Sequence, residues 1–174
     1  LDVGQGLAML IQTRHHVLVY DTGVKYFSGG DSGASIIVPY MQRQHLHHLD
    51  AMVISHPDVD HRGGMTSIIQ SYPPDMLYVD NPDYYQKGVS CHTGHTWQWD
   101  GVMFEFFALP THFVKSNNHS CVLKITTKTH QLLLTGDIER KAEEYLIKHY
   151  RNQLASTHLL IAHHGSKTSS SAAF

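Results

Sequence analysis

The chain has 174 residues, of which 41% are hydrophobic and 16% are charged. This composition excludes a disordered tail and a coiled coil, and the length fits one domain, residues 1–174, with a sizeable core. Thirteen Lys and Arg against fifteen Asp and Glu give a net charge of −2. Because proteins that bind nucleic acid mainly through counterion release are usually basic, any such binding must here be local or assisted by a metal.

Short apolar runs bounded by Gly, Pro, Asp or His favour buried strands over helices along most of the chain. In chain order they predict strands at Leu7–Ile11, Val17–Tyr20, Ala51–Ser55, Met76–Val79, Val102–Leu109, Cys121–Thr126, Gln131–Leu134 and Leu159–Ala162. Apolar residues at helical spacing predict helices at Ala34–Gln44, Gly64–Ser71 and Ile138–Tyr150. The order of these elements indicates an α/β protein with mixed sheets and helices outside. No apolar run reaches the ~18–20 residues that a transmembrane segment needs.

Polar side chains follow several of the predicted strands directly. Asp21 comes after the second strand, residues 56–61 after the third, Asp137 after the seventh, and His163 and His164 after the last. Ligands and catalytic groups gather in the loops at strand ends of α/β sheets. We therefore expect these loops to converge on one site.

The segment from His56 to His61 carries the strongest chemical signal. It places His56, Asp58, Asp60 and His61 within six residues, in a chain that holds sixteen His. A mixed set of imidazoles and carboxylates suits Zn, Mn or Fe(II), and carboxylates favour the harder ions. The alternative is a solvated loop with an Asp at a helix N-cap, but four ligand-type residues so closely spaced favour a metal site.

The motifs resemble those of the metallo-β-lactamase superfamily. His56-x-Asp58-x-Asp60-His61 is similar to its His-x-His-x-Asp-His signature, with Asp58 in place of the middle His. Further matches occur in the expected order at Asp21-Thr22-Gly23, Thr135-Gly136-Asp137 and His163-His164-Gly165-Ser166. The resemblance implies an αββα four-layer sandwich, with two mixed sheets packed together and helices outside.

Within that superfamily, the chain resembles the soluble domain of ComEC-type DNA uptake proteins. The motifs that carry this likeness are Asp2-Val3-Gly4-Gln5-Gly6, Ser55-His56-Pro57-Asp58 and Asn117-Asn118-His119-Ser120. In that family the domain continues past the His-His-Gly-Ser-Lys loop. The chain is therefore expected to be a piece of a longer membrane protein, truncated at the C-terminus of this domain.

The resemblance implies two metal positions that share one carboxylate. The first would be held by His56, Asp58 and Asp137, and the second by Asp60, His61, Asp137 and His164. Asp60, Asp137 and His163 are the implied catalytic residues. The resemblance also implies that His163 and Lys167 contact a substrate phosphate and that Asp21 orients a metal-bound His. Asp137 could instead, or in addition, be the N-cap of the helix expected from Ile138.

One departure from the family pattern concerns a further ligand. The superfamily usually has a ligand His between the second motif and the bridging Asp, where this chain reads Ser116-Asn117-Asn118-His119-Ser120. His119 could substitute for it, or the position could be completed by Asn or by water. The two cysteines, Cys91 and Cys121, could form a disulfide or stay free.

The function implied by the resemblance is metal-dependent hydrolysis of phosphodiester bonds in DNA, with two Mn²⁺ or Zn²⁺ ions. The domain would degrade the strand that is not imported during natural transformation. The implied partners are single-stranded DNA, a membrane channel in the same polypeptide and other competence proteins, with this domain on the periplasmic side of the inner membrane. The alternatives are a small-molecule phosphodiesterase, such as a phosphorylcholine esterase, and a catalytically degenerate module that guides DNA.

Overall fold

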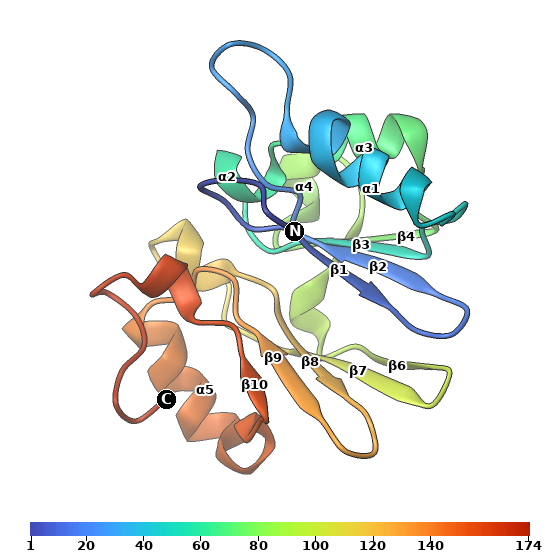
Figure 1. Cartoon of the computed structure of the whole chain (residues 1–174). Coiled ribbons are helices and arrows are strands. Elements are labelled where there is room, and N and C mark those ends of the chain that lie inside the picture. Colours follow the sequence, from blue (N-terminus) through green and yellow to red (C-terminus); the bar gives the residue numbers. More distant parts are fainter. The chain divides into compact units, whose positions relative to one another are not determined.

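The computed structural model describes all 174 residues, and the chain divides into two compact parts, Leu1–Val89 and Ser90–Phe174 (Figure 1). Each part has a sheet of its own and helices packed beside it. None of the helices combines the length and the apolar character that a membrane crossing requires.

The sheet of the first part is mixed. Its strands are β1 (Met9–Gln12), β2 (Val17–Tyr20), β3 (Ala51–Ile54) and β4 (Met76–Val79), in the order β1-β2-β3-β4. β1 and β2 form an antiparallel hairpin, whereas β2, β3 and β4 run parallel, with Val19 opposite Met52 and Met52 opposite Leu77. Every residue of β2 and β3 is buried, as their uninterrupted apolar sequences predict for strands covered on both faces. The short strand β5 (Val89–Ser90) lies at the boundary between the parts.

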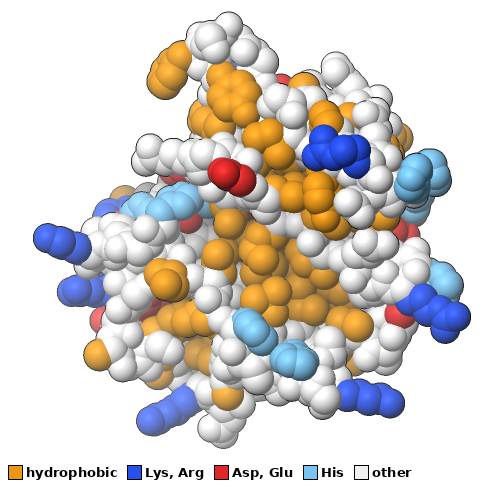
Figure 2. All heavy atoms as spheres, viewed as in Figure 1, with side chains coloured by type: hydrophobic (Ala, Val, Ile, Leu, Met, Phe, Trp, Pro, Cys, Tyr) orange, Lys and Arg blue, Asp and Glu red, His pale blue; other side chains and the backbone are white.

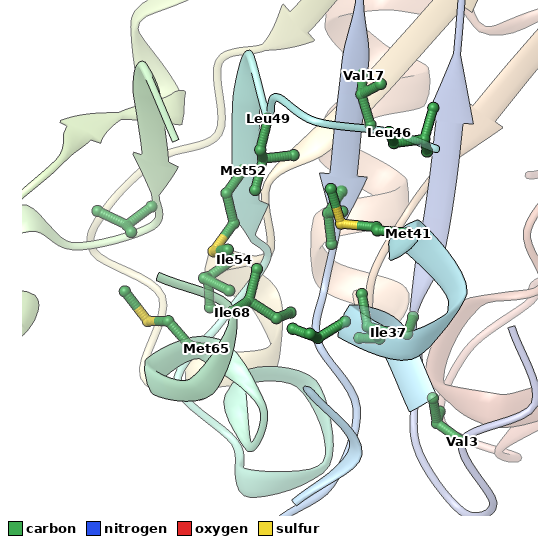
Figure 3. Packing of buried hydrophobic residues seen from close by; sticks show 14 residues of the cluster. Val3, Val17, Ile37, Met41, Leu46, Leu49, Met52, Ile54, Met65 and Ile68 are labelled. Atoms are coloured by element: carbon green, nitrogen blue, oxygen red, sulfur yellow. The ribbon is translucent and has the colours of Figure 1, made fainter. Parts of the chain in front are cut away.

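The first part has five helical segments, and those that contain Ile37, Met41 and Ile68 pack on this sheet. The five segments are η1 (a π-helix, Gly33–Ile37), α1 (Val38–Arg43), α2 (Val59–Arg62), α3 (Met65–Ser71) and α4 (Pro82–Tyr85). Met41 of α1 and Ile68 of α3 pack with Met52 and Ile54 of β3 in one buried cluster (Figure 3). This core fixes the end of β3, from which the His56–His61 segment emerges.

The second part has a largely antiparallel sheet. Its strands are β6 (Thr96–Trp99), β7 (Val102–Phe107), β8 (Val122–Thr126), β9 (Gln131–Leu134) and β10 (His158–Leu159), in the order β10-β9-β8-β7-β6. Only the β10–β9 pair is parallel among the pairs of this sheet. The helices are η2 (Cys91–Thr93), η3 (Ser116–His119), α5 (Arg140–Leu154) and η4 (Ala162–Gly165). α5 packs on the sheet through Ala142 and Leu146, which join the cluster of Val122 and Leu133.

Several sequence-based expectations need correction. The first strand is Met9–Gln12 rather than Leu7–Ile11, and the strand from Val102 ends at Phe107 rather than Leu109. The last strand is shorter than predicted: it covers His158–Leu159, and Ala162 already begins η4. The strand β6 was not among the predicted strands. The long helix begins at Arg140 rather than Ile138, because the backbone is still extended at its N-cap, Glu139 (φ −107°, ψ 177°). Asp137 is therefore not the N-cap of this helix.

A disulfide between Cys91 and Cys121 decides the alternative that the sequence left open. The bond joins η2 to the residue that precedes β8, across a sequence separation of 30 residues. Both cysteines are fully buried, with exposed fractions of 0%. The bond ties the Asn117–Ser120 segment to η2, because Cys121 directly follows that segment.

Replacement of both cysteines, Cys91→Ala with Cys121→Ala, is expected to lower the free energy of unfolding. A cross-link that closes a loop of this length restricts the unfolded chain by roughly 3–4 kcal/mol. Urea unfolding followed by circular dichroism measures the difference. A phosphine reductant should shift the wild-type midpoint toward that of the variant. An unchanged midpoint in both experiments would show that the bond does not stabilise the fold.

Candidate metal centre

A buried carboxylate organises the end of the sheet in the first part. Asp21 directly follows β2 and has an exposed fraction of 0%. Its Oδ1 accepts a hydrogen bond from the backbone N–H of Ser55 at 2.6 Å, and its Oδ2 accepts one from the Ser55 hydroxyl at 2.7 Å. Its Oδ2 also lies 2.8 Å from Nδ1 of His61. Parallel β2 and β3 end at the same edge, which is why residues 21 and 55 meet.

This hydrogen-bond network determines which ring nitrogen of His56 and His61 carries the hydrogen. An ionised carboxylate only accepts, so Nδ1 of His61 must carry the hydrogen that it shares with Asp21. The Ser55 hydroxyl gives its single hydrogen to Asp21, so it accepts from Nδ1 of His56, 3.0 Å away. In the neutral form of each ring, the Nε2 atom then keeps its lone pair, as a metal ligand requires.

The other ligand-type residues of this segment lie around the two Nε2 atoms. The His56 and His61 rings are 4.2 Å apart between centroids, and both side chains are fully buried. Asp58 Oδ2 lies 3.5 Å from Nε2 of His56, and Asp60 Oδ2 lies 3.8 Å from Nε2 of His61. Nε2 of His56 is buried and makes no hydrogen bond. A buried polar nitrogen without a hydrogen bond costs free energy unless another group, such as a metal ion, binds it.

The second part carries its own pair of candidate ligands. Asp137 follows β9 and is buried, and its backbone N–H donates to the Ser120 hydroxyl at 3.1 Å. Its Oδ2 lies 3.5 Å from Nε2 of His164, whose side chain is 38% exposed. The second part therefore presents one carboxylate and one accessible imidazole together.

Three of the candidate residues have a strained backbone. Asp21, His163 and His164 all have left-handed backbone conformations, with φ of 56°, 52° and 50°. Such conformations cost free energy for residues other than glycine and persist where the surrounding structure imposes them, often at functional sites. His163 and His164 are consecutive in η4, so two left-handed residues in succession set the direction of this turn.

His163 has different contacts from His164. Its Nε2 lies 3.4 Å from the Asn117 side-chain Nδ2, which donates, and its Nδ1 lies 3.0 Å from the Thr168 hydroxyl. Glu139 Oε1 lies 3.9 Å from the same Nδ1. These polar contacts hold the ring in place. Lys167 is exposed, and its carbonyl accepts from the Arg140 guanidinium at 3.3 Å.

His119 is turned toward the backbone of its own loop. Its Nε2 donates to the Phe113 carbonyl at 2.7 Å, which leaves Nδ1 as the nitrogen open to a ligand. The neighbouring His92 is partly buried, and this burial lowers the pKa of His92 to about 4. His92 is therefore neutral at pH 7 and adds no charge beside the loop.

A tyrosine near Asp21 also stays uncharged. Burial raises the pKa of Tyr85 well above its usual range, and the Asp80 carboxylate raises it further. The Tyr85 hydroxyl is buried without a hydrogen-bond partner. It is a neutral donor in the first part of the chain at any physiological pH.

Sequence reasoning missed the residues that position the candidate ligands. Ser55 joins Asp21 to His56, Ser120 holds the backbone of Asp137, and Asn117 orients His163. All of them lie within or beside the quoted Ser-His-Pro-Asp and Asn-Asn-His-Ser motifs. The signal that could have found them is that a metal-binding His needs a hydrogen-bond partner on its other nitrogen.

The donor sets of both parts suit a divalent metal. Imidazole and carboxylate are ligands that Zn²⁺ accepts, and the abundance of carboxylate oxygen also suits Mn²⁺. The free Nε2 of His56 supports this fit.

The fold and these ligand-type residues define the class of protein. The chain matches the Metallo-beta-lactamase superfamily over residues 1–174, and it belongs to that superfamily. The αβ architecture with two mixed sheets and helices agrees with the expectation from the sequence. A solved structure of the metallo-beta-lactamase SMB-1, in a complex with mercaptoacetic acid, has the same fold (TM-score 0.63, 12% identity, covering 90% of this chain and 72% of that one).

Two relatives are similar over almost the whole chain. Uncharacterized protein YcaI from Escherichia coli is 42% identical, over 98% of this chain and 22% of its own length. Competence protein ComA from Neisseria gonorrhoeae is 38% identical, over 99% of this chain and 24% of its own length. The chain thus spans less than a quarter of either relative, and the resemblance to competence proteins is confirmed.

Substitution of Asp21 by Asn tests the positioning network. Asn retains an acceptor for the Ser55 N–H but lacks the charge that holds the Nδ1 hydrogen of His61. We expect Asp21→Asn to weaken metal binding roughly 10- to 100-fold, the usual effect of losing a partner behind a metal-binding His. Isothermal titration with Zn²⁺ and Mn²⁺ measures this, with Asp83→Asn as an exposed control. Equal affinities for Asp21→Asn and the wild type would refute the role of the network.

Proposed function

We propose that this chain is a metal-dependent phosphodiesterase domain that hydrolyses DNA, in a protein of the ComEC type. The observation that carries the proposal is the Asp21–Ser55 network, which holds His56 and His61 through their Nδ1 atoms. It leaves the buried Nε2 of His56, which makes no hydrogen bond, to bind a metal. Membership of the superfamily supports metal-dependent hydrolysis. The similarity to a competence protein supports DNA as the substrate.

We assign the ligands as the superfamily motifs suggest. One ion would be held by His56, Asp58 and Asp137, and a second by Asp60, His61, Asp137 and His164. Asp137 would then serve both ions, and its carboxylate would contribute negative charge to each. His119 remains a candidate for an additional ligand through Nδ1, because its Nε2 is engaged by Phe113.

The chemistry of the reaction divides between the ions and the protein. Divalent ions in such sites activate water and neutralise the charge that develops on phosphate. Asp60 and Asp137 would act by holding those ions in position. His163, whose ring is fixed by Asn117 and Thr168, would donate a hydrogen bond to a phosphate oxygen of the substrate. Lys167 is exposed and would add positive charge there.

We place the domain on the periplasmic side of the inner membrane, next to a channel formed by the same polypeptide. The Cys91–Cys121 disulfide supports a compartment outside the cytoplasm, because disulfides persist in oxidising environments. The small share of the competence protein that this chain covers leaves room for such a channel. Tethering beside the channel would raise the local concentration of single-stranded DNA, and other competence proteins would deliver it.

Two other functions each have an observation in their favour. A small-molecule phosphodiesterase, such as a phosphorylcholine esterase, is favoured by the net charge of −2 and by the scattered Lys and Arg side chains on the face in Figure 2. A DNA-guiding module without catalysis is favoured by the engagement of His119 Nε2 with a backbone carbonyl. Digestion of single- and double-stranded DNA in Mn²⁺, Mg²⁺, Zn²⁺ and EDTA separates the three functions. Hydrolysis of bis(p-nitrophenyl) phosphate without DNA cleavage selects the first alternative, and a protein without bound metal or hydrolysis selects the second.

The variants Asp60→Ala and Asp137→Ala test the ligand assignment. Each removes a carboxylate that we assign to a metal, so both should lower the bound metal and abolish DNA hydrolysis while circular dichroism stays unchanged. Elemental analysis of the purified proteins measures the stoichiometry. Glu144→Ala removes an exposed carboxylate from α5 and should behave like the wild type. Wild-type metal content in both Asp variants would refute the assignment.

The variant Asp58→His tests the role of Asp58 in metal choice. It restores the His of the superfamily signature and exchanges an oxygen ligand for nitrogen, which should shift preference from Mn²⁺ toward Zn²⁺. Competition titrations of the two ions measure the ratio of affinities. If this ratio does not change, Asp58 does not contact the metal.

A further inference from the structure

A cavity of the second part lies between the loop that precedes η3 and the first turn of α5. Its volume is about 620 Å³, which is within the range of sites that hold small ligands. Its walls include Phe113 and Val114 on the apolar side, and on the charged side Lys115, Glu139, Arg140 and Lys141. The side chain of Val114 is completely exposed, at 100%.

Positive charge dominates this cavity, although the chain as a whole is negative. Three cationic side chains face one carboxylate. Lys115 Nζ lies 2.8 Å from Oε2 of Glu139, so this pair is largely neutral. Arg140 and Lys141 add two further charges on the exposed surface of the first turn of α5. A concave surface with an excess of one sign raises the local concentration of ligands of the opposite sign.

The cavity adjoins the residues that we assign to catalysis in the same part. Asn118 lines the cavity, and its side chain accepts a hydrogen bond from the Glu139 backbone N–H at 2.9 Å. Glu139 lies two residues after Asp137 in the chain. Thr168, which also lines the cavity, contacts Nδ1 of His163 at 3.0 Å through its hydroxyl. A substrate that fills the cavity would therefore extend to His163, which we propose to contact a phosphate of the substrate.

We propose that this cavity binds one nucleotide of single-stranded DNA beside the phosphodiester to be cleaved. The proposal rests on the proposed function. Lys141 and Arg140 contact the backbone phosphate, and the base lies against Phe113 and Val114. A single strand fits this combination of an apolar wall and a charged edge, because the bases of a duplex are stacked and their faces are not accessible. The cavity thus supplies the local nucleic-acid binding that the net charge of −2 does not.

The test compares two lysines of the same helix. Lys141 lines the cavity, whereas Lys148 is exposed on α5 outside it. Both substitutions, Lys141→Gln and Lys148→Gln, change the net charge equally and keep a residue that favours helix. Binding of a fluorescein-labelled (dT)12 is measured by anisotropy in EDTA, so that neither metal nor hydrolysis contributes.

We expect Lys141→Gln to raise the Kd for (dT)12 roughly five- to tenfold at 50 mM salt and to lower the salt slope by about 0.7, the effect of one phosphate contact on a single strand. Lys148→Gln should keep the wild-type Kd. An abasic oligonucleotide of the same length should bind the wild type more weakly than (dT)12. Equal effects of the two lysine variants would overturn the phosphate contacts, and equal binding of the two oligonucleotides would overturn the base contact.

A cleavage assay separates this proposal from the proposed function. In Mn²⁺, the ratio of kcat/KM for (dT)12 to kcat/KM for bis(p-nitrophenyl) phosphate should fall in Lys141→Gln and stay constant in Lys148→Gln. If the wild type binds (dT)12 through Lys141 but cleaves neither substrate, the cavity stands and the hydrolase function fails. If it cleaves (dT)12 and the ratio is the same in both variants, the function stands and the cavity fails.

Discussion

The need to satisfy one buried carboxylate organises the candidate metal centre in the first part of the chain. A charge with no exposure to water is tolerated only when donors surround it. Asp21 has three of them, from the Ser55 backbone, the Ser55 hydroxyl and the His61 ring. They are available because parallel β2 and β3 end together. The arrangement holds both imidazoles through their Nδ1 atoms, at the cost of a left-handed backbone at residue 21.

In the second part, different contacts position the candidate ligands. Its candidate ligands, Asp137 and His164, come from a strand end and from a turn with two successive left-handed residues. The Ser120 hydroxyl holds the backbone of Asp137, and the disulfide at Cys121 ties the segment that contains Ser120. In both parts, residues that do not contact a metal determine where the ligand atoms lie. This agrees with the general dependence of metal sites on the groups behind the ligands.

The sequence predicts the buried elements best, because their apolar runs are short and sharply bounded. The strands Val17–Tyr20, Met76–Val79 and Gln131–Leu134 have the predicted bounds. Elements that depend on contacts elsewhere were not predictable: β10 is only two residues long, because the chain after Leu159 leaves the sheet for η4. The start of α5 and the Cys91–Cys121 bond likewise follow from tertiary packing rather than local pattern. Motif spacing identified the ligand-type residues, but not Ser55, whose role depends on a partner 34 residues away.

The proposed function depends on the binding of a divalent metal ion by His56 and His61 in the first part of the chain. Anomalous diffraction at the Mn absorption edge, from crystals grown with Mn²⁺, tests it most directly. We expect anomalous peaks within about 2.0–2.5 Å of the Nε2 atoms of His56 and His61. The absence of an anomalous peak at both nitrogen atoms would contradict the proposal.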